Sequence, residues 1–358
     1  MPTLLDPVRI GALSLPNRVV MAPLTRCRAE PGHVPGALMA QYYAQRASAG
    51  LVIAEATMVE EGNSAFIAEP GIHSDAQVRG WKAVTDAVHA AGGRIALQLW
   101  HGGRACHPSM NDGRGTVSSC STPIDGQVMT LSGPQPHVAP RELRDDELPG
   151  IVAAFGRAAR HAKAAGFDAV EVHGANGYLL DQFLRDGCNR RTGPYGGSIA
   201  NRARLLLECV DACASEIGID RVGVRISPLN SYNSMKDSDP VALTTHVAAE
   251  LGRRGAAYLH LMRADFAGVQ KGDVVTPARA AFRGALILNM GFSRDEAERA
   301  IEQGTADAIA FGVPFIANPD LVERFRTGAP LAAPDQSTFY LGGPKGYVDY
   351  PALQAAAH

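Results

Sequence analysis

The chain has 358 residues, of which 46% are hydrophobic and 20% are charged, and its formal net charge is −2 at pH 7. This balance provides no basic surface for nucleic acid or for an anionic membrane, and no apolar run is long enough to cross a bilayer. The amino terminus lacks a basic region followed by an apolar stretch, so we expect a cytoplasmic protein whose partners are small molecules. The six cysteines include no Cys-x-x-Cys pair, which argues against zinc or an iron–sulfur cluster.

Eight short apolar runs predict buried parallel strands, and helical patterns lie between them. The runs cover residues 18–22, 51–55, 94–99, 168–172, 221–226, 257–262, 284–288 and 307–311. The helical patterns cover residues 36–49, 75–91, 145–165, 198–217, 240–254, 293–303 and 318–327. This alternation predicts an α/β fold, a single (β/α)8 TIM-barrel domain over residues 1–358, with its chemistry at the carboxyl ends of the strands. A doubly wound sheet is the alternative, but no Gly-x-Gly-x-x-Gly motif opens a helix after an early strand.

Two segments interrupt this repeat. Residues 104–143, between the third strand and its helix, are rich in Ser, Pro, Gly and Asp. A connection of this length predicts a lid or capping segment, and we expect it to cover the site. Residues 328–358 contain several glycines and tyrosines but too few apolar residues for a domain, so we expect a tail that lies over the barrel rim.

The fourth predicted strand runs directly into three polar side chains, His173, Asn176 and Tyr178. This set suits a polarised carbonyl group. His173 and Asn176 would hold the oxygen as it becomes negative, and Tyr178 would then donate a proton. In isolation the pattern fits a polar loop better, but its position at the end of a barrel strand favours a reaction site.

Eight motifs, one of which is Asn201-Arg202, occur in order after successive strands, and the other seven are longer. They are Met21-Ala-Pro-Leu-Thr-Arg26, Glu55-Ala-Thr57, Gln98-Leu-Trp-His-Gly-Gly-Arg104, Glu171-Val-His-Gly-Ala-Asn-Gly-Tyr-Leu-Leu-Asp-Gln-Phe183, Asn189-Arg-Arg-Thr-Gly-Pro-Tyr-Gly-Gly-Ser198, Val224-Arg-Ile-Ser-Pro228 and Ala317-Asn-Pro-Asp-Leu321. Together they resemble, nearly end to end, the old yellow enzyme family of FMN-dependent ene reductases, also called NADH:flavin oxidoreductases. With Thr25 rather than a cysteine at this position, the chain resembles the branch of that family without a redox-active cysteine.

The resemblance implies FMN as cofactor and NADPH or NADH as reductant. Hydride would pass through FMN to the β-carbon of an α,β-unsaturated carbonyl or another activated alkene, and nitro compounds are a further class that the resemblance leaves open. Tyr178 would protonate the α-carbon. The physiological alkene, the preferred nucleotide and the oligomeric state stay open.

The same resemblance assigns residues to the flavin ring. Thr25, Gln98 and Arg225 would contact its polar edge, where the positive charge of Arg225 would stabilise the anionic reduced form. Alone, each has an ordinary alternative: a turn residue, a core amide and an internal ion pair. The backbone along the ring would come from Pro23, Leu24 and Ala56.

The FMN phosphate would lie on the loops after strands seven and eight, where barrels often bind phosphate. The residues implied there are Met290, Gly291, Phe292, Phe311, Gly312 and Val313. Relatives commonly have Gly in place of Met290 and Arg in place of Val313, so the usual cation is missing. Backbone amides would then hold the phosphate, and we expect FMN to dissociate more readily than from relatives.

For the substrate, the resemblance points to four residues: Trp100, Phe66, Asn233 and Tyr347. Each of them alone also fits ordinary packing. Two other functions remain open from the residues: a non-flavin barrel hydrolase or lyase with His173 as base and Glu55 or Glu171 as its partner, and a non-catalytic flavin-binding protein. A metal site at His173 is not expected, because no second ligand lies at chelating spacing.

Overall fold

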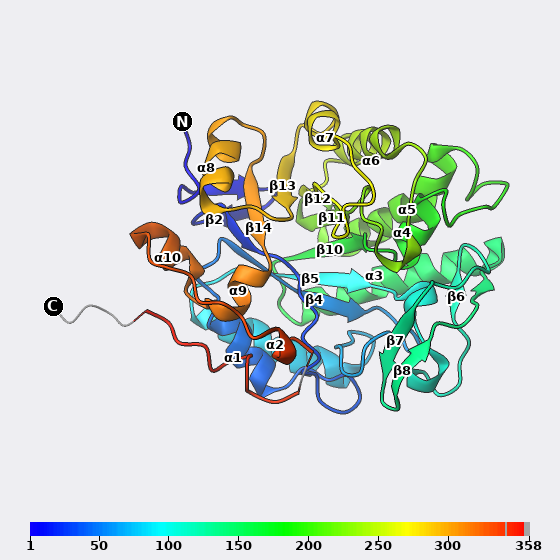
Figure 1. Ribbon diagram of the computed structural model, residues 1–358, viewed down its shortest axis with the longest axis horizontal. Coiled ribbons are helices and arrows are strands. Elements are labelled where there is room, and N and C mark those ends of the chain that lie inside the picture. Colours follow the sequence, from blue (N-terminus) through cyan, green and yellow to red (C-terminus); the bar gives the residue numbers. More distant parts are fainter. Residues whose placement is uncertain (341, 354–358) are drawn as a thin grey trace.

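A computed structural model describes residues 1–340 and 342–353 (Figure 1). Eight parallel strands close into one barrel, in which β14 pairs with β3 to complete the circle. The strands are β3 (Val19–Met21), β4 (Leu51–Met58), β5 (Ile95–Trp100), β10 (Ala169–Gly174), β11 (Val222–Ile226), β12 (Tyr258–Met262), β13 (Ala285–Asn289) and β14 (Ala308–Phe311). The predicted (β/α)8 TIM barrel is confirmed, and each of the eight predicted runs forms one of its strands.

Helices surround the barrel, and the seven predicted helical segments are all found. They are α1 (Ala37–Ala44), α2 (Asp75–Ala90), α3 (Leu148–Ala164), α5 (Ile199–Ile217), α6 (Pro240–Arg254), α8 (Arg294–Glu302) and α10 (Leu321–Thr327). The structure adds three short helices that the sequence pattern does not predict: α4 (Leu179–Leu184), α7 (Val275–Ala281) and α9 (Val313–Ala317). Five to seven residues span too few turns to show a helical period.

The barrel strands are mostly apolar because both of their faces are covered. Every residue of β4, β5, β10, β11, β12 and β14 is buried. Along β4, Val52 and Ala54 belong to a large cluster that includes the helices, whereas Ile53 belongs to a separate cluster of barrel side chains. Parallel strands with two covered faces form such continuous apolar runs. In the described part of the chain, no helix is long and apolar enough to span a membrane.

The connections add small elements outside the barrel. An N-terminal hairpin joins β1 (Val8–Ile10) to β2 (Leu13–Leu15). Within residues 104–143, β6 (Val117–Ser118) pairs with β9 (Arg141–Glu142), and β7 (Gln127–Thr130) forms a hairpin with β8 (Gly133–Pro136) that projects at the edge of the molecule (Figure 1). The described residues also include six short 3-10 helices: Gly103–Ala105, Pro108–Met110, Asp145–Glu147, Ile219–Arg221, Tyr232–Ser234 and Gln336–Thr338.

The C-terminal tail is anchored to the segment that follows β3. Arg26 Nη2 donates to the carbonyl of Gly346 at 2.8 Å, and Arg28 Nη2 donates to the carbonyl of Thr338 at 2.8 Å. These contacts bring the tail to the carboxyl-end rim of the barrel. Residues 341 and 354–358 of the predicted tail lie outside the described residues.

Candidate active site

A cavity of about 310 Å³ lies at the carboxyl ends of the barrel strands. Its walls come from the ends of β3, β4, β5, β10 and β11 and from the start of α9. Eleven residues that the sequence singles out line it together: Pro23, Leu24, Thr25, Ala56, Phe66, Gln98, His173, Asn176, Tyr178, Arg225 and Val313. Residues separated by up to 290 positions therefore meet where the barrel fold predicts a reaction site.

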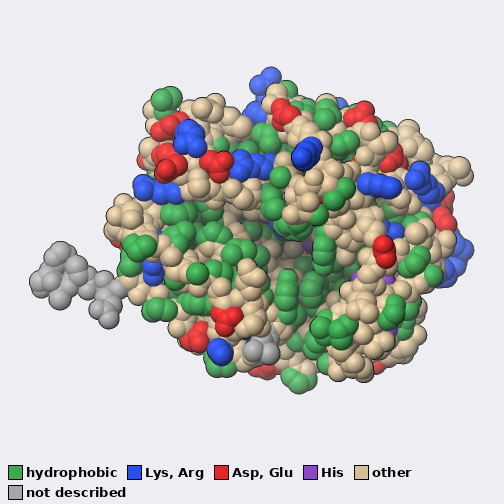
Figure 2. Space-filling view, viewed as in Figure 1, with side chains coloured by type: hydrophobic (Ala, Val, Ile, Leu, Met, Phe, Trp, Pro, Cys, Tyr) green, Lys and Arg blue, Asp and Glu red, His purple; other side chains and the backbone are tan. Residues whose placement is uncertain are grey.

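A second cavity of about 470 Å³ adjoins the first. Phe66, Tyr178, Tyr232 and Tyr340 line both cavities, so these aromatic rings stand between them. The outer wall includes residues 124–129, which lie in the connection between β5 and α3 and lead into the β7–β8 hairpin. Apolar side chains flank the hollow at the centre of this face (Figure 2).

His173 is a neutral hydrogen-bond donor. Its Nδ1 accepts from the backbone N–H of Ala175 at 3.3 Å, so the ring proton is on Nε2. Burial, together with the charge of Arg225 and the nearby His260, lowers the pKa of His173 well below its usual value. The imidazole is therefore uncharged at neutral pH.

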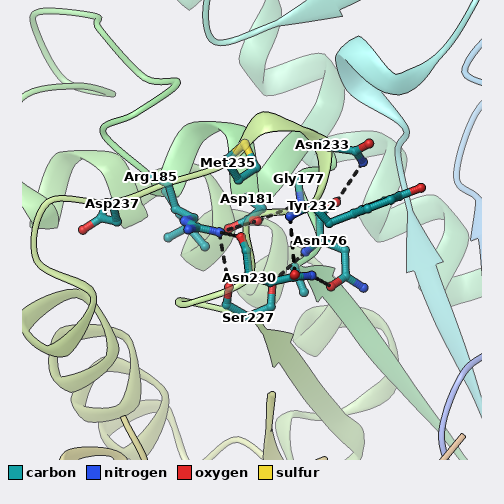
Figure 3. A network of polar contacts seen from close by, with 12 residues as sticks. Asn176, Gly177, Asp181, Arg185, Ser227, Asn230, Tyr232, Asn233, Met235 and Asp237 are labelled. Carbon is teal, nitrogen blue, oxygen red and sulfur yellow. Dashed lines mark hydrogen bonds and ion pairs between the residues drawn. The ribbon is translucent and has the colours of Figure 1, made fainter. Parts of the chain in front are cut away.

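Asn176 is held by three polar contacts from the loop after β11 (Figure 3). Its N–H donates to Ser227 Oγ at 2.8 Å, and its backbone carbonyl accepts from Asn233 Nδ2 at 2.9 Å. Its side-chain Oδ1 accepts from Asn230 Nδ2 at 2.9 Å. The backbone is left-handed, with φ 58°, a conformation that Asn tolerates better than most residues. Among the described residues, no group accepts a hydrogen bond from its Nδ2.

Tyr178 supplies a protonated phenol. The residue is the N-cap of α4, and its ring lies edge-on to Trp100, with centroids 5.1 Å apart, and to His173, with centroids 5.2 Å apart. Burial raises the pKa of Tyr178 well above its ordinary value, so the hydroxyl keeps its proton at neutral pH.

The cavity floor offers one acceptor and one cation. Gln98 Nε2 donates to Glu171 Oε1 at 2.8 Å, and this contact leaves the Oε1 atom of Gln98 available as an acceptor. Arg225 Nη2 donates to Asn289 Oδ1 at 2.9 Å, while its Nε is buried without a hydrogen-bond partner in the described structure. A buried N–H without a partner marks a place where an acceptor fits. These two side chains can therefore serve the N–H and carbonyl groups of a flavin edge.

Neither carboxylate suggested as a partner for a His173 base contacts that histidine. Glu171 Oε2 pairs with His260 Nδ1 at 2.8 Å, and Glu55 accepts from the hydroxyl of Tyr43 at 2.9 Å. The base–carboxylate pair that the hydrolase or lyase alternative requires is therefore not formed. The low pKa of His173 also makes it a weak base.

The residues predicted at the phosphate end lie on two adjacent loops. Met290 and Gly291 both have positive φ, 97° and 67°. Arg263 holds their carbonyls, with Nε donating to Met290 O at 2.9 Å and Nη2 donating to Gly291 O at 3.2 Å. Phe292 and Phe311 line a separate cavity of about 250 Å³, and Gly312 is the N-cap of α9. Of the predicted phosphate-end residues, only Val313 lines the 310 Å³ cavity, and its side chain is 48% exposed.

Two predicted substrate residues lie outside both cavities. Trp100 is fully buried behind Tyr178, and Tyr347 is stacked on Tyr42, with centroids 4.0 Å apart. Tyr347 is therefore a packing residue, because the anchored tail turns its ring toward α1. The same tail places Tyr340 at the cavity instead. Asn233 lines the 470 Å³ cavity, as a substrate residue would.

Sequence reasoning missed four aromatic residues that line the 310 Å³ cavity: Tyr232, Phe266, Phe339 and Tyr340. They lie in a short 3-10 helix, on a loop and on the tail, where no periodic pattern distinguishes them. Paired aromatic residues in a glycine-rich tail, such as Phe339 and Tyr340, are the one signal that could have pointed to them.

The NADH:flavin oxidoreductase / NADH oxidase family matches residues 3–332 of the chain. The chain belongs to this family, which includes the old yellow enzymes. A protein of Leishmania infantum named probable flavin mononucleotide-dependent alkene reductase is 48% identical over 356 residues, a match that covers 98% of this chain and 97% of that protein. Morphinone reductase in complex with tetrahydroNAD superimposes with a TM-score of 0.94 at 49% identity, covering 99% of this chain and 98% of the other. The old yellow enzyme homologue from Zymomonas mobilis gives a TM-score of 0.96 at 42% identity, covering 98% and 100%.

The family establishes the chemistry. The chain is an FMN-dependent ene reductase that takes its electrons from a nicotinamide nucleotide and reduces activated C=C bonds. The function and the cofactors predicted from the motifs are confirmed, and the hydrolase or lyase alternative is not supported. The assignment to the branch with Thr25 stays a prediction.

Proposed function

We propose that the 310 Å³ cavity binds an α,β-unsaturated carbonyl compound, with His173 and Asn176 holding its oxygen and Tyr178 protonating its α-carbon. The observation that carries this proposal is that three side chains able to donate a hydrogen bond line the same cavity. His173 presents a neutral Nε2–H, Asn176 has an Nδ2 group without a protein acceptor in the described structure, and Tyr178 keeps its phenolic proton. Two neutral donors and one neutral acid thus line a single cavity.

Bound FMN, once reduced, supplies the hydride for the β-carbon of the alkene. The oxygen gains negative charge during that step, so donors already aimed at it bind the transition state more tightly than the ground state. Tyr178 then transfers its phenolic proton to the α-carbon, and the phenolate recovers a proton from water. Its raised pKa favours this order, because the phenol gives up a proton only to a strongly basic carbon.

For the flavin ring, we propose contacts with Thr25, Gln98 and Arg225. The partner-free Nε of Arg225 and the available Oε1 of Gln98 match the acceptor and donor groups along a flavin edge. Pro23, Leu24 and Ala56 line the same wall and would lie against the ring.

For the phosphate, we propose the backbone N–H groups of Gly291 and Phe292, with Gly312 and Val313 facing them from the next loop. A trans peptide points its C=O and its N–H in opposite directions. Because Arg263 binds the carbonyls of Met290 and Gly291, the N–H groups of those same two peptides point away from its guanidinium. Successive N–H groups that share a direction form an anion-binding concavity.

The outer parts of the chain complete the proposal. Residues 104–143 would act as a lid, since this connection walls the 470 Å³ cavity. Phe66, Asn233 and Tyr340 would limit the size of the substrate, and the tail from residue 328 would support Tyr340. One catalytic domain over residues 1–358, a cytoplasmic location and activity on nitro compounds stay predictions.

The test is the double substitution His173→Ala and Asn176→Ala in the FMN-loaded enzyme. With the flavin reduced by dithionite under anaerobic conditions, oxidation by cyclohexenone should slow by a factor of about 100 or more, since one lost oxyanion donor costs about 10²–10³ in rate. The flavin spectrum and the melting temperature of the variant serve as controls for folding and cofactor binding. An oxidation rate equal to that of the parent would rule out the proposed donor pair.

A further inference from the structure

We propose that Asn230 is a positioning residue that fixes the side-chain amide of Asn176, so that Nδ2 rather than Oδ1 faces the substrate. The inference rests on the proposed role of Asn176 as a donor to the carbonyl oxygen. Asn230 lies four residues beyond β11 and is fully buried next to Asn176 (Figure 3). It does not line either cavity of the site, so it would act through Asn176 alone.

An asparagine amide can turn over with little change in shape. Its two orientations place either an acceptor or two donors in the same position. For a substrate carbonyl, these orientations have opposite effects, because an oxygen that gains negative charge is attracted by N–H and repelled by C=O. The function of Asn176 therefore depends on which orientation the surroundings select.

The backbone around Asn230 determines how its own amide is turned. The N–H groups of Tyr232 and Phe266 both point at Asn230 Oδ1, at 3.4 Å and 3.5 Å. A backbone N–H can only donate, so the oxygen of Asn230 must lie on that side. Nδ2 then lies toward Asn176 and donates to its Oδ1 at 2.9 Å. The Nδ2 group of Asn176 is consequently turned toward the cavity.

A buried ion pair holds Asn230 in place relative to the loop after β10, which carries Asn176. Arg185, at the end of α4, donates through Nη1 to the carbonyls of Asn230, at 2.5 Å, and Ser227, at 3.3 Å. Its partner Asp181, 3.7 Å away, accepts from the N–H of Gly177 at 2.8 Å. The loops after β10 and β11 are thus connected through one charged pair (Figure 3).

Replacements at position 230 should rank by the partner that they offer to Asn176. Leucine has nearly the same shape and no polar group, so the Asn176 amide would lose its orientation. Aspartate offers only acceptors, so the amide would turn its Nδ2 toward residue 230 and present Oδ1 to the substrate. The proposal therefore predicts that Asn230→Asp is more harmful than Asn230→Leu, although aspartate retains polarity and size.

The experiment uses the FMN-loaded enzyme and 4-chlorophenol, whose oxygen mimics the developing negative charge. Dissociation constants come from the absorbance change of the flavin, including the long-wavelength band of a phenolate stacked on it. We expect binding weaker by about tenfold for Asn230→Leu, as for loss of one hydrogen bond to a charged group. Asn230→Asp should weaken binding further and remove the long-wavelength band, because the phenol would stay protonated against an acceptor.

Two further variants separate the possible outcomes. Ser231→Ala removes the hydroxyl hydrogen bond from this neighbour of Asn230 to Asp265, in the loop after β12, without touching Asn176, so binding should stay within about twofold of the parent. In the double variant Asn176→Ala with Asn230→Leu, the second change should add nothing to the first, since Asn230 acts only through that amide.

The results distinguish failure of this inference from failure of the proposed function. Parent-like phenol binding by Asn176→Ala would overturn the donor role of Asn176 itself. Weak binding by Asn176→Ala combined with parent-like binding by Asn230→Leu would overturn only the role of Asn230. If Asn230→Asp does not retain FMN, the leucine variant and the double variant still decide the question. An additive double variant would show that Asn230 supports the loop in general rather than the amide.

Discussion

Met290 provides the sharpest stability test, because its backbone has φ 97° in a residue that is not glycine. We compare Met290→Gly with Met290→Ala, since both remove the half-buried side chain and only glycine relieves the backbone. A left-handed conformation costs a non-glycine residue roughly 1–2 kcal/mol. Glycine loses about 0.5–1 kcal/mol through its greater freedom in the unfolded chain. We therefore expect the free energy of unfolding of the glycine variant to be about 1 kcal/mol higher than that of the alanine variant.

The sign of this difference is the decisive quantity. At an exposed helical position such as Arg299 in α8, the order should reverse, with alanine more stable than glycine by about 1 kcal/mol. Gly291, with φ 67°, gives the matching prediction that Gly291→Ala is destabilising.

Urea unfolding of the FMN-free protein, followed by tryptophan fluorescence, measures all of these variants. If Met290→Ala were as stable as Met290→Gly, the positive φ of Met290 would not exist in solution. The proposed arrangement of its neighbouring N–H groups around a phosphate would then lose its support.

Three further predictions concern other residues. Tyr178→Phe should leave reduction of FMN by NADPH near normal in stopped-flow experiments but slow its reoxidation by cyclohexenone, and parent-like reoxidation would make Tyr178 only a wall of the cavity. Val313→Arg should tighten FMN by about 1.5–3 kcal/mol in equilibrium dialysis, the value of a charge-assisted contact, and an unchanged Kd would show that another cation already serves. Burial raises the pKa of Glu55 to about 7, so the folded state holds its proton more tightly than the unfolded chain and stability falls as pH rises from about 4.5 to 7. Relative to Glu55→Gln, the parent should lose about 2.5 kcal/mol of unfolding free energy between pH 5 and pH 8 in urea titrations, and a constant difference would contradict the raised pKa.

The barrel could be predicted because its strands are covered on both faces. Apolar runs such as residues 51–54 can be recognised in the sequence without any knowledge of the neighbouring strands. The longer helices have an apolar stripe, as in α3, where Ile151, Phe155 and Ala162 are buried. The helices that were missed are too short to show a stripe.

The site could be predicted only where a residue's place follows from a strand end. His173, Gln98 and Arg225 are on strands, so the barrel alone brings them together. The tail has no such constraint, and its path depends on Arg26 and Arg28, more than 300 residues earlier in the chain. That is why Tyr347 was wrongly placed at the cavity. Long-range hydrogen bonds such as the one between Asn230 and Asn176 leave no trace in sequence spacing.

The charges around the cavity link the properties of Arg225 and His173. Glu171, the nearest carboxylate on β10, is engaged by His260 and Gln98, so it does not neutralise Arg225 through a direct hydrogen bond. Arg225 is therefore free to face the negative charge of a reduced flavin. Its charge also helps to lower the pKa of His173. In the proposed mechanism, Arg225 favours the reduced cofactor and also helps to keep the imidazole of His173 neutral. His173 then donates a hydrogen bond to the substrate without competing for the proton that Tyr178 transfers.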